Sequence, residues 1–245
     1  MDLVTSTELA LLGTTAFVAG TVRGFSGFGS GLVFLPVTAQ ILPPFAALTT
    51  VAIADLLGAV PNFPRAVKEC DRRDLLLLLG GLAVALPLGV WTLTFLDPST
   101  FRYGVSALAL LLLGCLLFGV RYSGPVPDSM VYATGGLSGF CCGVAGIPGP
   151  PVILFYMARP LAPQVIRANT FIFLTSTDLA MLPVLFAFGR LDGSAVLLGT
   201  VLIVPNMAGN LLGAWLFRPE YERLYRGLAY AVIAAMAVLT LPLWD

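Results

Sequence analysis

Apolar runs long enough to cross a membrane recur along the whole chain of 245 residues. The hydrocarbon core of a bilayer is about 30 Å thick and takes about 20 helical residues to cross. Six runs of this order, separated by short polar segments, are Ala47–Phe63, Leu75–Leu96, Tyr103–Val120, Asn169–Phe188, Ala195–Phe217 and Leu224–Leu243. Only 11% of the residues are charged, against about a quarter in a soluble domain. The sequence therefore predicts an all-α, multi-pass integral membrane protein.

The side chains that usually carry enzyme chemistry are scarce. The chain has no histidine, which is the most common metal ligand and titrates near neutral pH. Its four cysteines, Cys70, Cys115, Cys141 and Cys142, form no CxxC pair, so we interpret them as small apolar residues. Thirteen basic residues balance thirteen acidic ones, which leaves no net positive charge to attract nucleic acid. We expect no metal, no cofactor, no nucleic-acid partner and no enzyme activity.

Two further apolar stretches, Glu8–Leu42 and Met130–Ala158, are interrupted near their middles by glycine and proline. At a rise of 1.5 Å per residue, the first would form a helix roughly 50 Å long, which is too long for one upright span. Each stretch could instead break and return to the side from which it entered, as a re-entrant helical hairpin. Two topologies therefore compete: eight simple spans, or two broken hairpins and six spans.

Basic residues in the loops distinguish the two topologies, because short cytoplasmic loops are rich in Lys and Arg. With eight simple spans, six basic residues lie on each side. With two hairpins, ten lie on one side and only Arg102 and Arg190 on the other. The ten are Arg65, Lys68, Arg72, Arg73, Arg121, Arg159, Arg167, Arg218, Arg223 and Arg226. We therefore predict hairpins, with both termini outside and loops 64–74, 121–128, 159–167 and 218–226 in the cytoplasm. Eight simple spans stay as the alternative.

The chain also contains an internal repeat. A shift of 115 residues aligns the residues that bend a backbone. The pairs are Gly20 with Gly135, Gly24 with Gly139, Phe25 with Phe140, Gly31 with Gly146, Pro36 with Pro151 and Val37 with Val152. We assign residues 1–120 to a first repeat, 121–129 to a cytoplasmic linker and 130–245 to a second repeat, within one membrane domain. Halves of opposite orientation with discontinuous helices at corresponding positions are typical of secondary transporters.

The two glycine-rich segments resemble those of a known family. Residues 20–36 read GTVRGFSGFGSGLVFLP and residues 135–151 read GGLSGFCCGVAGIPGPP. In a duplicated chain of this length, they are similar to the TauE/SafE sulfite and organosulfonate exporters. The resemblance implies export of sulfite or a small organosulfonate, or movement of related anions, across the bacterial inner membrane. The repeat and the loop charges predict an inverted-repeat transporter in which each half has one re-entrant hairpin and three transmembrane helices.

The glycine-rich breaks are the candidate binding site for such an anion. Glycine turns expose backbone N–H groups, and the helix that leaves each turn directs its positive end to the same place. Arg23 lies next to the first break, where it could attract an anion or simply neutralise Asp55. The candidate binding residues are Arg23, Gly24, Ser26, Gly27, Gly29, Ser30, Gly31, Gly143, Gly146, Gly149, Arg167, Asn169 and Thr170. The alternative is that the glycines only allow helices to pack closely.

Asp55 and Asp178 are acidic residues near the middles of apolar spans. Either could carry a coupling proton, and a structural hydrogen-bond role is the alternative for both. The leading functional hypothesis is a proton-coupled secondary transporter for a small sulfur anion. We expect it to be embedded in the lipid bilayer, and a homodimer is one possible assembly. A passive anion channel would have the same pathway without a coupling acid, and a membrane assembly subunit is the third possibility.

Overall fold

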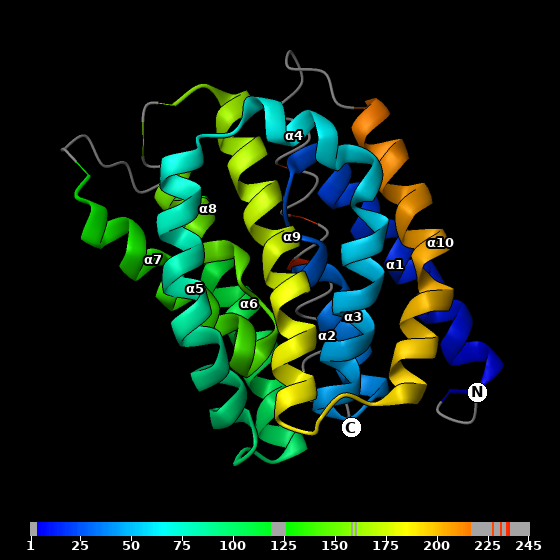
Figure 1. Ribbon diagram of the computed structural model, residues 1–245. Helices are drawn as coiled ribbons and strands as arrows, with labels where there is room; N and C mark the ends of the chain where they lie inside the picture. Colours follow the sequence, from blue (N-terminus) through cyan, green and yellow to red (C-terminus); the bar gives the residue numbers. More distant parts are fainter. Residues whose placement is uncertain are drawn as a thin grey trace.

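The computed structural model describes residues 4–118, 126–157, 159, 161–216, 227, 231, 234 and 235, and every regular element among them is helical (Figure 1). The elements are α1 (Ser6–Ser26), α2 (Ser30–Ile41), α3 (Pro44–Gly58), a 3-10 turn η1 (Val60–Asn62), α4 (Phe63–Glu69), α5 (Arg72–Leu93), α6 (Pro98–Phe118), α7 (Asp128–Ala145), α8 (Gly149–Met157), α9 (Pro163–Ala187) and α10 (Gly193–Leu216). Within the described part, five helical segments are long and apolar enough to cross a membrane. The described part is therefore all-helical, as expected of an integral membrane protein.

The predicted spans correspond to helices, with corrections at their ends. The expected spans that begin at Leu75, Tyr103, Asn169 and Ala195 lie in α5, α6, α9 and α10. The span expected over Ala47–Phe63 lies within one long apolar helical segment, Pro44–Glu69. Inside this segment α3 ends at Gly58, and Pro61 and Pro64 follow. Proline cannot donate the backbone hydrogen bond that a continuous helix needs.

Two predicted loops are partly helical. The segment expected to be the loop 64–74 contains most of α4, and the loop expected over 159–167 ends inside α9, which begins at Pro163. Figure 1 shows α4 lying across one end of the molecule. The last predicted span, Leu224–Leu243, and the loop 218–226 lie outside the continuous described ranges.

Each glycine-rich stretch is divided into two helices. A left-handed glycine ends the first helix in both cases, Gly27 with φ 82° in one and Gly146 with φ 64° in the other. Glycine adopts this conformation without the steric cost that a Cβ atom brings. The interval from Gly27 to Gly146 also separates Ser30 from Gly149, the first residues of α2 and α8. The structure therefore pairs Gly27 with Gly146, whereas the sequence alignment paired Gly31 with Gly146. The two alignments differ by four residues.

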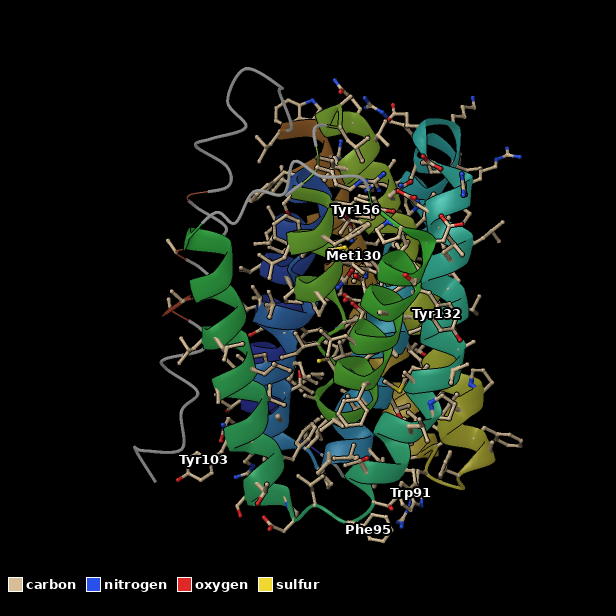
Figure 2. All side chains as sticks on the ribbon, turned by 90° about the vertical axis from the view of Figure 1, so that its left-hand side faces the viewer. Trp91, Phe95, Tyr103, Met130, Tyr132 and Tyr156 are labelled. Atoms are coloured by element: carbon tan, nitrogen blue, oxygen red, sulfur yellow. The ribbon has the colours of Figure 1, made fainter. Side chains whose placement is uncertain are left out.

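Aromatic side chains mark one end of the molecule, where Figure 2 shows Trp91, Phe95 and Tyr103. We call it the aromatic end. The helix α6 begins at this end, directly after Asp97. The Asp97 carboxylate accepts hydrogen bonds from the Ser99 hydroxyl and the Thr100 N–H, which lower the pKa of Asp97 to about 2.

Both termini of the α1–α2 pair lie at the aromatic end. Arg102, near the start of α6, donates from Nε to the Ala39 carbonyl at 2.9 Å, near the end of α2. A cavity of about 210 Å³ between the starts of α1 and α10 is lined by Thr5 and Ser194. Arg190, which precedes α10, lies 5.1 Å from the centre of the Phe45 ring at the start of α3. The first helix pair thus begins and ends at one end of the molecule.

The α7–α8 pair begins and ends at the opposite end, which we call the basic end. Arg73 at the start of α5 forms an ion pair with Asp128 at the start of α7, with 2.8 Å between Nη2 and Oδ2. Arg159, which follows α8, forms an ion pair with Asp74 of α5. The two helix pairs therefore have opposite directions in the molecule.

Glycine contacts join the first helix of each half to the long helix of the other half. A Cβ atom on Gly135 of α7 would overlap the carbonyl oxygen of Leu78 in α5. A Cβ atom on Gly20 of α1 would overlap the carbonyl oxygen of Asn206 in α10. Such close backbone approach is typical of membrane helices with small residues four apart. The two breaks that follow α1 and α7 also lie close together, since a Cβ atom on Gly31 would be 3.3 Å from the Gly146 carbonyl oxygen.

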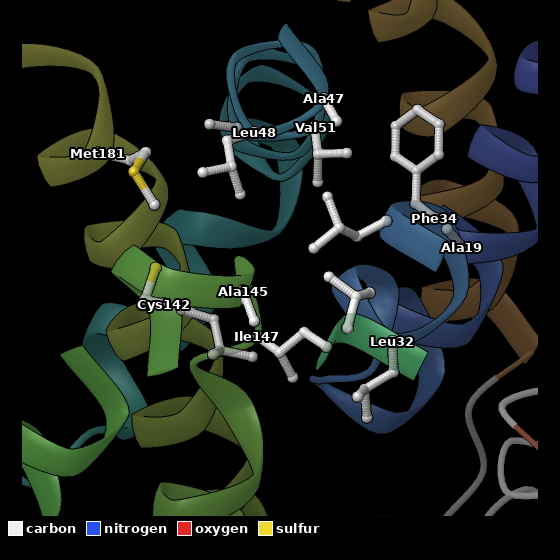
Figure 3. Packing of buried hydrophobic residues seen from close by; sticks show 14 of the residues in the cluster. Ala19, Leu32, Phe34, Ala47, Leu48, Val51, Cys142, Ala145, Ile147 and Met181 are labelled. Carbon is white, nitrogen blue, oxygen red and sulfur yellow. The ribbon is translucent and has the colours of Figure 1, made fainter. Parts of the chain in front are cut away.

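The hydrophobic core surrounds this central contact. Leu32 of α2 and Ile147 of the second break are buried in one cluster with Leu48 and Val51 of α3. Figure 3 shows these side chains close together, with Met181 of α9 nearby. Within the protein, the breaks are enclosed by apolar side chains, as irregular backbone at membrane depth requires.

Candidate anion site

A cavity of about 30 Å³ lies between the two breaks. It is lined by Arg23, Gly29, Ser30, Gly31, Leu32, Val51, Asp55, Gly146, Ile147, Pro148, Gly149, Leu174 and Asp178. A Cβ atom on Gly31 would lie 3.3 Å from the Gly146 carbonyl oxygen, so the breaks almost touch. Because one water needs about 10–15 Å³ of such space, the cavity in this conformation has room for a very small solute.

Arg23 is the largest fully buried side chain at the cavity, with 1% of its surface exposed. Its Nη1 lies 3.0 Å from Asp178 Oδ2 and 3.2 Å from Asp55 Oδ2. Its Nη2 donates to Thr175 Oγ1 at 2.9 Å, and the guanidinium carbon lies 5.4 Å from the centre of the Phe171 ring. Among the described residues, Arg23 Nε is buried without a hydrogen-bond partner. The guanidinium thus joins α1 to α3 and α9.

Asp55 is held by polar side chains from three helices. Its Oδ1 accepts from Asn206 Nδ2 at 2.8 Å, and its Oδ2 accepts from the Ser30 hydroxyl at 2.5 Å. The contacts continue away from the cavity, since Asn210 donates to Asn206 and Asn62 donates to Asn210, both at 3.3 Å. This polar network links the first break to α10 and to the turn that follows α3.

The charges at the cavity are one guanidinium and two carboxylates. With both carboxylates ionised, the cluster has one negative charge in excess, and one proton makes it neutral. The backbone offers a second set of donors at the start of α2. The N-cap residue is Gly29, which has no side chain to cap the N–H groups of the first turn. These N–H groups and the positive end of α2 favour a negative solute. Arg23 forms ion pairs with both Asp55 and Asp178.

Seven of the predicted binding residues do not line the cavity. Gly24 packs against Asn210 of α10, and Gly143 packs against Leu86 and Val90 of α5, as helix-packing glycines do. Asn169 and Thr170 are engaged near the start of α9, Asn169 with the Asp71 N–H at 2.8 Å. The other three meet at the end of α1, where Ser26 and Gly27 end the helix and Arg167 of α9 contacts it.

Those three residues stabilise the turn after α1. The Ser26 hydroxyl donates to backbone carbonyls, including that of Phe28 at 2.7 Å. Arg167 Nη2 donates to the Gly24 carbonyl at 2.6 Å, which supplies a partner for the last turn of α1. A Cβ atom on Gly27 would lie 2.8 Å from Arg167 Cγ. Arg167 therefore packs against the end of α1 and does not line the cavity.

Two residues at the site were not among the predicted binding residues. Asn206 orients Asp55 and Thr175 accepts a hydrogen bond from Arg23. Both are polar residues inside long apolar segments, which was the available signal. Among the described residues, no group of three or more carboxylate or thiol side chains could hold a metal ion.

The comparison with known families decides what kind of protein contains this site. Residues 12–240 match the family model described as sulfite exporter TauE/SafE. The chain belongs to the TauE/SafE family. The resemblance inferred from the two glycine-rich segments is confirmed, and TauE/SafE membership makes the protein a membrane transporter. No solved structure matches this TauE/SafE chain significantly.

A curated relative supports the same assignment. The TauE/SafE chain is 26% identical over 247 residues to a protein of Cupriavidus necator named probable sulfite/organosulfonate exporter TauE. The match covers 96% of this chain and 95% of the relative. The similarity therefore extends over both halves, including the breaks.

Proposed function

We propose that this TauE/SafE protein is a secondary transporter that exports a small sulfur-containing anion, sulfite or an organosulfonate, with coupling to protons. The observation that carries the proposal is the cavity at which both glycine breaks meet Arg23, Asp55 and Asp178. Sulfite and sulfonate each present three oxygen atoms around sulfur, which can accept several hydrogen bonds at once. The printed name of the relative, a sulfite/organosulfonate exporter, supports this class of substrate.

In this mechanism the three sulfur-bound oxygens accept hydrogen bonds from the backbone N–H groups in the first turn of α2, while the Ser30 hydroxyl keeps its bond to Asp55. Arg23 supplies the counter-charge once the carboxylates have taken up a proton. Leu32, Ile147 and Leu174 form the apolar wall on the other sides. Excluding water strengthens each of these polar interactions, because the effective dielectric constant is lower there.

The proposed topology has two re-entrant hairpins of opposite orientation. The α1–α2 pair begins and ends at the aromatic end, and the α7–α8 pair begins and ends at the basic end, which supports this arrangement. Alternating access would follow if one half rocks against the other around the central cavity. The basic end would face the cytoplasm of a bacterial inner membrane, because Arg65, Arg73 and Arg159 lie there while Arg102 and Arg190 lie at the other end.

Flux into proteoliposomes tests the function directly. We expect purified protein to move radioactive sulfite and methanesulfonate down imposed gradients, and to show counterflow when the vesicles are loaded with unlabelled anion. Counterflow requires a carrier that alternates between two sides, so a passive channel would give flux without it. Vesicles with protein but no flux of either anion would contradict the proposed function.

Cysteine accessibility tests the hairpins. In a variant without its four native cysteines, Thr5→Cys and Gln40→Cys should react with a membrane-impermeant maleimide from the same side of sealed vesicles. Lys68→Cys, at the basic end, is the matched control and should react only from the other side. If Thr5→Cys and Gln40→Cys react from opposite sides, Glu8–Leu42 crosses the membrane once and the hairpin proposal is wrong.

A further inference from the structure

We propose that Asp178 carries the coupling proton and that Asp55 is a positioning residue that stays ionised. This assignment rests on the proposed proton-coupled transport and names which of the two buried acids performs it. Both acids contact the same atom, Arg23 Nη1, so charge alone does not distinguish them. Their other contacts do.

Asp55 has both of its oxygen atoms occupied by donors. Asn206 donates to Oδ1, while Ser30 and Arg23 approach Oδ2, and only 3% of the side chain is exposed. A proton on either oxygen of Asp55 would displace one of these donors, so the carboxylate has no free position for it. The donors also come from three different helices, so Asp55 fixes the first break relative to α1 and α10.

Asp178 has far fewer partners. Among the described residues it accepts a hydrogen bond from Arg23 alone, at 3.0 Å to Oδ2. Its side chain is 15% exposed and lines the cavity between the breaks. The charged or titratable groups that face it from the packed helices of the described part are Arg23 on α1, Asp55 on α3 and the Cys142 thiol on α7. A proton can reach Asp178 from the cavity without breaking a donor contact.

Protonation of Asp178 prepares the site for an anion. The carboxylate takes one proton from the water in the cavity, which removes the excess negative charge of the cluster. Arg23 Nη1 then has one ionised partner, Asp55, and can donate to the entering anion. When the anion leaves, Asp178 returns the proton to the water on that side. The anion and the proton therefore move together.

Proton uptake during binding tests the assignment. Sulfite binding to the purified full chain is measured by calorimetry at pH 8.5, in two buffers whose ionisation enthalpies differ, so that the difference in heat counts protons. At this pH free sulfite is mainly the dianion. We expect the wild type to take up about one proton per bound anion and Asp178→Asn to take up none. We also expect wild-type affinity to fall up to tenfold per pH unit toward high pH, and Asp178→Asn affinity to stay constant.

Asp178→Glu is the conservative control and should again take up a proton. Proton uptake that persists in Asp178→Asn overturns the assignment. It is also overturned if a folded Asp55→Asn variant loses proton uptake while Asp178→Asn keeps it. Absence of both sulfite and methanesulfonate binding in the wild type would instead contradict the proposed function, and the assignment with it. The two failures are thus distinguishable.

Discussion

Arg23→Gln is expected to abolish sulfite flux and to destabilise the protein by about 3–5 kcal/mol, the range for breaking a buried ion pair by removing one partner. The substitution leaves Asp55 and Asp178 next to each other with no cation, inside a cluster where Arg23 is only 1% exposed. Among the described residues that line the cavity, Arg23 is the only cation, so the substitution also removes the counter-charge for the anion. Thermal unfolding in detergent and proteoliposome flux measure the two effects separately.

A neutral triple variant separates stability from transport. In Arg23→Gln/Asp55→Asn/Asp178→Asn, all three charges are removed together, so most of the lost stability should return. Effects of residues in one buried network are not additive. Transport should stay absent, because neither the counter-charge nor the proton carrier is present. Normal flux in Arg23→Gln, or restored flux in the triple variant, would contradict the role given to Arg23.

Hydropathy predicts much of this fold because a membrane helix must satisfy its own backbone hydrogen bonds. That constraint identified α5, α6, α9 and α10 directly. The division of the Pro44–Glu69 segment into α3, η1 and α4 was not predicted, since Pro61 and Pro64 fall inside and just after an apolar run that by composition looks continuous.

The internal repeat stays a prediction from the sequence, and the sequence does not determine its register. Glycines recur four residues apart in both halves, so a slip of four residues still aligns Gly20 and Gly24 with glycines. Only the left-handed caps, Gly27 and Gly146, establish which glycines correspond. The prediction that the two stretches are not straight helices depends on composition alone and did not need the register.

The candidate site shows a similar division. Arg23, Asp55 and Asp178 could be selected because charged residues inside apolar spans are costly and therefore few. Their mutual contact joins residues 155 positions apart in sequence, which periodicity cannot predict. For the same reason sequence could not distinguish glycines that line the cavity, such as Gly31, from glycines that pack helices, such as Gly143.

Gly31→Val is expected to lower sulfite flux more than tenfold while it changes stability little. Gly31 lies in the first turn of α2 and lines the cavity, and a Cβ atom there would meet only the Gly146 carbonyl oxygen, at 3.3 Å. The backbone does not require glycine here, because its φ is not positive. The two methyl groups of valine would occupy the space of a cavity of about 30 Å³.

A graded series distinguishes a blocked cavity from a misfolded protein. Gly31→Ala adds one methyl group and should reduce flux less than Gly31→Val, with the thermal midpoint of both close to that of the wild type. Gly13→Val is the matched control, because Gly13 also lies in a helix and has no atom within 4 Å of an added Cβ. It should leave flux and stability unchanged. Full flux in a folded Gly31→Val would mean that the anion does not pass between the two breaks, since no path through this cavity tolerates two added methyl groups without a cost in rate.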